Sequence, residues 1–221
     1  MKTRLTICLI LLGFNISAQN YTPKAGDLLF QDLDCGPFCD AIEKVTTGYN
    51  NYSFSHVGIL NNENGVWNVL EAGGSGVVVT PLTDFLNRTK DEFGNPKVIV
   101  GRLKASNAAS LGLDISKSLT LAKSHLGKTY DDGFVLNNNK FYCSELVYEC
   151  FLDAQGQPVF STNPMTFKDP ENNEIFSAWD NYFDELGLNI PEGEPGLNPG
   201  GISLSPIIEI VHQYGIPSQK Q

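Results

Sequence analysis

Short, largely apolar stretches separated by polar and Gly-containing turns recur in the first half of the chain, which is typical of β-strands. The expected strands are residues 28–31, 54–60, 66–72, 77–80 and 97–103. Asn61 to Gly65 separates the second strand from the third and predicts a hairpin turn. If Asn61 pairs with Val66, His56 stands directly opposite Glu71, whereas a shift of one residue would place the two on opposite faces.

Apolar positions three and four residues apart predict helices elsewhere in the chain. They are expected at 40–46, 81–86, 115–126 and 176–186, with a further helix that begins near Cys143. After that helix the chain becomes rich in Gly and Pro, so 155–201 is otherwise predicted to form long loops. Such loops are often binding elements, although plain surface is equally allowed. Ile207 to Val211 fits either a strand or a helix.

Cys143 shares one helix face with apolar residues three to eight positions later, so its thiol is expected to point inward. Those residues are Leu146, Val147, Cys150 and Phe151. The polar turn at 137–139 places the helix start close to Cys143, where the helix dipole and unpaired backbone N–H groups favour a thiolate. This is the setting of a nucleophile. On helix position alone, a buried structural cysteine is the commoner alternative.

The first residues have the pattern of a secretory signal peptide. A basic start is followed by an apolar run at 5–14 and by a small residue, Ala18. We therefore expect a signal peptide at 1–18, a single mature domain at 19–221, and export to the periplasm or the extracellular space. Loss of Lys2 and Arg4 would change the net charge from −10 to −12. Such acidity argues against nucleic acid or an anionic lipid surface as a partner.

The mature chain offers no second long apolar run, so no stable membrane insertion is expected after signal cleavage. Cys35 and Cys39 flank a tight loop and could form a local disulfide in an oxidising compartment or remain two free thiols. Zinc binding by this pair would need two further ligands, which the surrounding sequence does not offer. We expect no metal and no cofactor, and the sequence leaves the oligomeric state open.

His56 is the best candidate for a base that takes a proton from Cys143. The two other histidines are His125, beside a helix end, and His212, near the C-terminus. Glu71 could accept a hydrogen bond from the second ring nitrogen of His56. Taken singly, His56 would more often be a structural histidine of a sheet, and Glu71 a solvated strand residue.

Five segments together resemble the YiiX/YaeF-type permuted papain-like amidases, a circularly permuted branch of the NlpC-type cysteine peptidase superfamily. They are Gly26–Phe30, Phe54–Ile59, Leu70–Ala72, Gly127–Asp131 and Tyr142–Val147. In unpermuted papain-like enzymes the cysteine helix precedes the histidine strand, whereas here His56 precedes Cys143. The order of the segments therefore matches the permuted branch.

The resemblance implies an α+β fold in which an antiparallel, barrel-like sheet packs against the helix that carries Cys143. It further implies Cys143 as nucleophile, His56 as base and Glu71 as the residue that orients the imidazole. Candidate substrate-binding residues are Tyr130, Tyr142 and Ser55. Many unpermuted relatives have Asp at the position of Tyr142.

These residues lead us to expect a secreted cysteine amidase that hydrolyses an amide in a cell-wall peptide or an N-acyl amino acid through a thioester. One alternative is a thiol acyltransferase that uses lipid or amine acceptors, as in relatives of lecithin–retinol acyltransferase. A non-catalytic binding protein with the same fold is another. The expected partner is a small peptide or acyl-amino-acid substrate.

Overall fold

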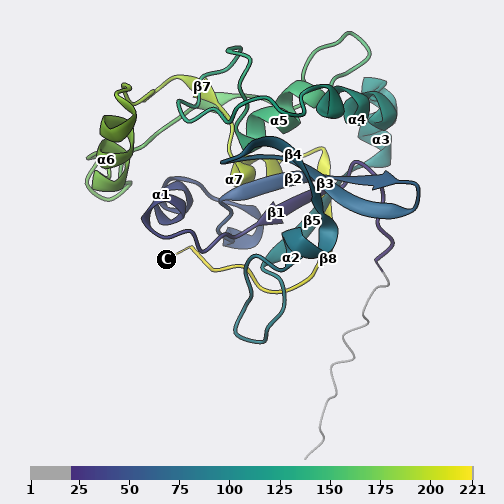
Figure 1. Ribbon diagram of the computed structural model, residues 1–221, viewed down its shortest axis with the longest axis horizontal. Helices are drawn as coiled ribbons and strands as arrows, with labels where there is room; N and C mark the ends of the chain where they lie inside the picture. Colours follow the sequence, from purple (N-terminus) through teal and green to yellow (C-terminus); the bar gives the residue numbers. More distant parts are fainter. Residues whose placement is uncertain (1–20, 221) are drawn as a thin grey trace, which may run out of the picture.

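The computed structural model describes residues 21–220 (Figure 1). The predicted signal peptide at 1–18 lies outside the described residues. No helix within the described part of the chain is both long enough and apolar enough to cross a membrane.

A six-stranded antiparallel sheet forms the centre of the domain, in the order β4-β3-β2-β1-β5-β8 (Figure 1). Its strands are β1 Leu28–Gln31, β2 His56–Glu63, β3 Val66–Gly73, β4 Gly76–Pro81, β5 Val98–Leu103 and β8 Ile208–Gln213. Among the described residues, β4 and β8 are the two edges and do not pair with each other. The sheet is therefore antiparallel, as expected, and its two edge strands leave it open. The segment near 207–211, for which the sequence allowed a strand or a helix, is a strand.

Helices cover both faces of the sheet. The α-helices are α1 Pro37–Val45, α2 Leu82–Leu86, α3 Ala105–Leu111, α4 Ile115–Ser124, α5 Cys143–Cys150, α6 Ser177–Leu186 and α7 Pro199–Ser203. A 3₁₀ turn at Tyr49–Asn51 and a short ribbon of β6 Asn163–Pro164 with β7 Pro195–Gly196 complete the elements. The sequence patterns did not indicate α3 and α7.

Alternation along the strands explains the two layers of core. Leu28 and Phe30 of β1 pack into the core that includes α5, whereas Leu29 between them packs with Phe85 of α2 on the opposite face. Successive strand side chains point to opposite faces, so a sheet with apolar residues at every position is covered on both sides. Figure 1 shows α5 and α4 on one side of the sheet and α2 on the other.

The hairpin of β2 and β3 has a different register from the predicted one. Asn61 pairs with Asn68 and not with Val66, and the turn shortens to Asn64 and Gly65, since Glu63 pairs with Val66. Both turn residues have positive φ, 53° and 87°, as a two-residue Asn-Gly hairpin turn requires. The prediction that His56 lies directly opposite Glu71 is therefore wrong by two residues. Because two is an even shift, both side chains remain on one face, as diagonal neighbours.

Candidate active site

Cys143 is the first residue of α5 and is buried. The chain enters the helix through a turn in which Asn137 and Asn139 have left-handed φ of 65° and 64°. The buried Glu145 of the first turn accepts a hydrogen bond from the backbone N–H of Tyr142 at 3.4 Å. An N-terminal carboxyl group that caps the preceding residue fixes where the helix begins. These contacts hold the Cys143 sulfur at a defined point beside β2.

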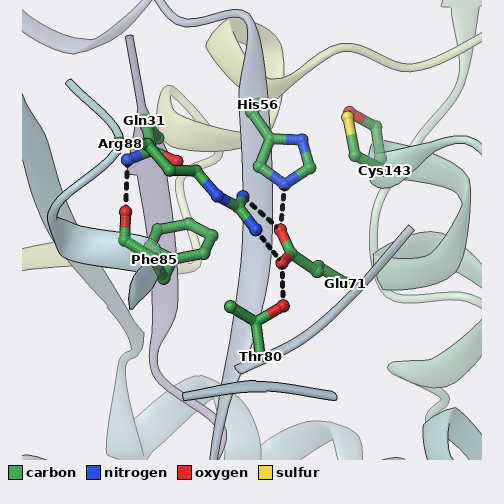
Figure 2. Close-up of polar contacts among 8 residues, drawn as sticks. Gln31, His56, Glu71, Thr80, Phe85, Arg88 and Cys143 are labelled. Carbon is green, nitrogen blue, oxygen red and sulfur yellow. Dashed lines mark hydrogen bonds and ion pairs between the residues drawn. The ribbon is translucent and has the colours of Figure 1, made fainter. Parts of the chain in front are cut away.

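His56 is the first residue of β2, and its Nε2 lies 2.6 Å from Oε2 of Glu71 on β3. The β2–β3 ladder ends at Ile59 and Leu70, so the pair lies just beyond the last paired residues. In Figure 2 the other ring nitrogen, Nδ1, is on the side of the imidazole that faces the Cys143 sulfur. The structure thus brings Cys143, His56 and Glu71 together in the order that the sequence predicted.

Gly58 has no side chain, which leaves room for His56 and Glu71 to approach each other. A Cβ atom at Gly58 would lie 2.3 Å from Cγ1 of Val69 and 3.5 Å from the Cβ of Glu71. Real contacts of this kind are never as short as the first distance, so a side chain at position 58 would push β3 away. The absence of a side chain therefore permits the diagonal approach of His56 to Glu71.

Sequence reasoning missed two partners of Glu71. Arg88, in the loop after α2, donates from Nη1 to Oε2 at 2.7 Å and from Nη2 to Oε1, while the Thr80 hydroxyl also donates to Oε1 (Figure 2). The Arg88 guanidinium also lies over the Phe85 ring, 5.0 Å from its centroid. Thr80 could have been found from alternation along β4, but no periodic pattern marks Arg88. A paired and hydrogen-bonded carboxylate of this kind stays ionised and keeps one orientation.

The contacts within the site shift the pKa values of Cys143, His56 and Glu71, and all three shifts favour the charged form of the group. Burial alone would lower the pKa of His56, but hydrogen bonding to Cys143 and Glu71 outweighs it and raises the pKa to about 9. Burial opposes ionisation of Cys143, yet the hydrogen bond and charge of His56 bring the pKa of the thiol below its ordinary value. Burial also opposes ionisation of Glu71, whose pKa falls to about 2 through His56 and Arg88. These directions favour a thiolate–imidazolium pair at neutral pH.

A neighbouring carboxyl group does not oppose the thiolate. Burial, followed by repulsion from Asp131, raises the pKa of Glu145 to about 8. Glu145 is therefore mostly uncharged at neutral pH, although it lies two residues from Cys143. The first turn of α5 can then stabilise a negative sulfur without a second negative charge beside it.

Cys143 opens onto a pocket of about 740 Å³, a volume that includes its open mouth. The three residues expected to contact substrate, Tyr130, Tyr142 and Ser55, all line this pocket. The Tyr142 hydroxyl accepts a hydrogen bond from the backbone N–H of Leu197, and the Ser55 hydroxyl accepts one from Leu33. The pKa of Tyr130 is well above its usual range because of burial and the nearby Cys143, so its hydroxyl stays protonated.

Of the two alternatives for Cys35 and Cys39, a disulfide or two free thiols, the structure contains the disulfide. Cys35 and Cys39 are bonded across the start of α1, with their Cα atoms 5.3 Å apart. α1 in turn supplies Ile42 and Val45 to the pocket wall, and Thr46, which follows the helix, also lines it. The disulfide thus fixes the beginning of an element that borders the site.

Residues 22–212 match the sequence profile of the permuted papain-like amidase enzymes of the YaeF/YiiX type, the C92 family. The chain belongs to this family. The match covers the whole sheet except the last residue of β8, together with all seven α-helices. The family is one of papain-like amidases and cysteine peptidases, which agrees with a cysteine at a helix start beside a histidine.

Two relatives of this chain in the YaeF/YiiX family come from Escherichia coli. The protein YiiX of strain K12 is 28% identical over 214 residues, which cover 96% of each chain. The crystal structure of YiiX from strain O157:H7, described as a metalloprotein, has a TM-score of 0.69 and 26% sequence identity, with 88% of this chain and 99% of that chain covered. Within residues 21–220 of the present chain, no group of three or more His, Cys, Asp or Glu side chains is placed to hold a metal ion.

Proposed function

We propose that this protein is a cysteine amidase that hydrolyses an amide through a thioester on Cys143. The observation that supports it best is the position of the His56 ring, with Nε2 bonded to Glu71 and Nδ1 facing the sulfur (Figure 2). A base within reach of a nucleophile, oriented by a third group, is the arrangement on which covalent acyl transfer depends. Membership of an amidase family supports the same reaction class.

In the proposed first half-reaction, the Cys143 thiolate attacks the amide carbonyl carbon. The backbone N–H of Cys143, at the start of α5, donates to the oxyanion that forms. The imidazolium of His56 then gives its Nδ1 proton to the leaving nitrogen, the carbon–nitrogen bond breaks, and an amine departs. Cys143 is left as a thioester and His56 as a neutral base.

Water completes the cycle. Neutral His56 takes a proton from a water molecule whose oxygen attacks the thioester carbonyl, and the carbon–sulfur bond breaks. The products are a carboxylic acid and the regenerated thiolate–imidazolium pair. Glu71 keeps the imidazole in one orientation and stabilises its charged form throughout, while Arg88 and Thr80 hold Glu71.

Intact-protein mass spectrometry during turnover of an N-acyl p-nitroanilide tests this proposal. The wild-type protein should gain the mass of one acyl group, located on Cys143, and release p-nitroaniline. Cys143→Ala should lose both the adduct and at least about 10⁴-fold in kcat/KM, since no nucleophile remains. Turnover that persists in Cys143→Ala would exclude the thioester route. An acyl product formed mainly on an added amine, rather than on water, would instead identify an acyltransferase.

We also propose that the protein is exported after cleavage following Ala18. The N-terminal sequence pattern and the Cys35–Cys39 disulfide, which persists most readily in an oxidising compartment, support this location. N-terminal sequencing of the protein from periplasmic and medium fractions should give a chain that begins at Gln19. A chain that retains Met1 and stays in the cytosolic fraction would refute export.

A further inference from the structure

Hydrogen bonds hold the two peptide units at the start of α5. The unit before Tyr142 accepts through its oxygen from the backbone N–H of Asp131 at 3.2 Å, and its own N–H donates to Oε2 of Glu145 at 3.4 Å. The unit after Tyr142 accepts through its oxygen from the backbone N–H of Leu146 at 3.1 Å. The N–H of this second unit belongs to Cys143, and a helix leaves its first N–H groups without an internal partner. These bonds therefore fix the direction of the N–H that donates to the oxyanion in the proposed reaction.

Glu145 is the only one of these partners that acts through its side chain. It is 1% exposed, and Asp131 is 2% exposed. The Asp131 carboxyl group accepts from the backbone N–H of Gly133 at 3.2 Å and from that of Val135 at 2.6 Å, which are contacts of the kind that an ionised carboxylate makes. Among residues 21–220, neither Glu145 nor Asp131 forms an ion pair with Lys, Arg or His. Two buried carboxyl groups that repel each other without a cation between them are costly to ionise together, so Glu145 holds a proton.

The elements around α5 bring no compensating charge to Glu145. The two charges with the largest effect on it are those of Asp131 and Glu149, and both are negative. α5 packs against α4, β2, β3 and α7. The titratable side chains on these four elements and on residues 129–142 are Lys117, Lys123, His56, Glu63, Glu71, Tyr130, Asp131, Asp132, Lys140 and Tyr142. Two of the lysines are exposed and the third pairs with Glu63, while the imidazole is bonded to Glu71. No positive charge on these elements therefore pairs with Glu145.

We propose that Glu145 is a positioning residue of the reaction, which holds the start of α5 as an uncharged group and slows the reaction when it ionises. This inference rests on the proposed function, because the group that Glu145 positions is the backbone N–H of Cys143. Glu145 acts through the backbone of Tyr142 and contacts no reacting atom. It goes beyond the roles of Cys143, His56 and Glu71, since it assigns an alkaline limit of activity to a fourth residue.

The alkaline limit follows from two pKa values. Burial, followed by repulsion from Asp131, raises the pKa of Glu145 to about 8. Above that pH a second buried negative charge lies two residues from Cys143, where it opposes both the thiolate and the oxyanion. Loss of the proton from the His56 imidazolium comes only about one pH unit higher, since its pKa is about 9. In the wild-type protein, kcat/KM for an N-acyl p-nitroanilide should therefore fall with a midpoint near pH 8.

Two substitutions of Glu145 separate its charge from its hydrogen bond. Glu145→Gln keeps an acceptor for the Tyr142 N–H and stays uncharged at every pH, so the alkaline midpoint of kcat/KM should move from about 8 to about 9. Glu145→Ala also removes the acceptor and leaves a buried N–H unpaired. Its kcat/KM at pH 7 should lie at least about tenfold below that of Glu145→Gln. An alkaline midpoint that stays near 8 in Glu145→Gln, or equal values for the two variants at pH 7, would overturn the positioning role.

Glu149→Gln is the matched control. It removes one negative charge from the same helix one turn later, at a side chain that is only half-buried. Because Glu149 repels Glu145, its removal favours ionisation of Glu145, and the alkaline midpoint should stay near 8 or move lower. An upward shift equal to that of Glu145→Gln would show that any carboxylate on α5 limits the reaction, and would contradict a specific role of Glu145.

The charge of Glu145 can also be measured without turnover. In protein labelled with ¹³C at the glutamate carboxyl groups, the NMR signal of Glu145 should titrate with a midpoint near 8 and be absent from Glu145→Gln. The signal of Glu43, whose pKa burial raises to about 7, should remain in both proteins. A midpoint near the ordinary 4.5 for Glu145 would overturn the inference even in an active amidase. A midpoint near 8 in a protein that forms no acyl-enzyme would instead refute the amidase proposal, and with it the positioning role, while the uncharged state of Glu145 would stand.

Discussion

The two free cysteines of the described chain lie at opposite ends of α5, and they differ in chemistry although both are buried. Cys143 begins the helix beside His56, and its pKa lies below the ordinary value. Cys150 ends the helix among apolar side chains, where burial, followed by repulsion from Glu149, raises its pKa far above the ordinary value. The same helix thus carries a thiol that ionises readily and one that does not.

The difference shows that burial does not decide whether a cysteine is reactive. Desolvation opposes the thiolate at both positions. Only Cys143 has an imidazole beside it (Figure 2) and the positive end of the helix dipole behind it. Cys150 lies at the negative end of the same dipole. Three variants, with a fourth as a control, test this difference between Cys143 and Cys150.

His56→Ala should remove most of the difference in thiol reactivity between Cys143 and Cys150. Without the imidazole, the pKa of Cys143 returns to its ordinary value or above, because the burial that opposes the thiolate is then offset only by the smaller effects of the hydrogen bonds from Ser144 and Val57. At pH 6 the thiolate fraction should then fall to about one in a thousand. The rate of iodoacetamide labelling at Cys143, followed by mass spectrometry, should drop by about 10³-fold at pH 6. Cys150 should stay unlabelled in both proteins, and a wild-type rate in His56→Ala would rule out activation by the base.

Arg88→Met should reduce the difference in reactivity between Cys143 and Cys150 without abolishing it. Glu71 has a folded pKa of about 2 against an ordinary 4.5, so its stabilising effect is present above pH 4.5 and is lost as the pH falls toward 2. Without Arg88 the folded pKa rises. The dependence of the unfolding free energy on pH between 4.5 and 2 should then become shallower, and kcat/KM should fall by about tenfold because the imidazole is held less firmly.

Arg102→Met is the matched control for that experiment. Arg102 also binds a buried carboxylate through two nitrogens, with Nε and Nη2 at 2.6 and 2.7 Å from the two oxygens of Asp27. It should lower stability by a comparable amount while leaving the pH profile of kcat/KM unchanged. If both variants change that profile alike, the effect of Arg88 is a general loss of stability and not a positioning of Glu71.

Cys150→Ala should have the smallest effect on activity. A buried thiol without a base is a packing group, so kcat/KM should stay within about twofold of the wild-type value. Loss of the sulfur from the core should lower the free energy of unfolding by about 1–2 kcal/mol. Urea unfolding and kinetics on the same protein measure the two effects. A tenfold loss of kcat/KM without a loss of stability would show that Cys150 takes part in the reaction.

The sequence predicted those parts of the site that follow from periodicity and chain order. Strand alternation placed His56 and Glu71 on one face, and this survived a register error of two residues because the pleat repeats every two. The helix face of Cys143 followed from the spacing of its apolar residues. The start of α7 was not predicted, although it carries a local signal that could have found it: Asn198 is followed by Pro199, and the Asn198 side chain accepts a hydrogen bond from Gly201.

The rest depends on contacts that no local pattern encodes. Arg88 reaches Glu71 from an irregular loop, and the two residues are 17 positions apart. Phe167 comes from a stretch that reads as a loop and Trp179 from the helix predicted at 176–186, and no pattern in the sequence places either ring in the pocket. Which residues of such a segment turn inward is decided by tertiary packing. The residues that line the pocket could therefore be named only once the tail was placed in space.

The order of parts along the chain has a consequence for how this protein could change. His56, Glu71, Arg88 and Cys143 all precede the end of α5, whereas Met165, Phe167, Trp179 and Leu197 of the pocket wall all follow it. Exchange of the segment between α5 and β8 for that of another family member would alter which molecules are accepted while the reacting groups stay untouched. Part of the pocket wall is thus separate along the chain from the reacting groups, whereas Ser55, Tyr130 and Tyr142 come from the same stretch as those groups. A chimera joined near residue 152 would exchange only the first part.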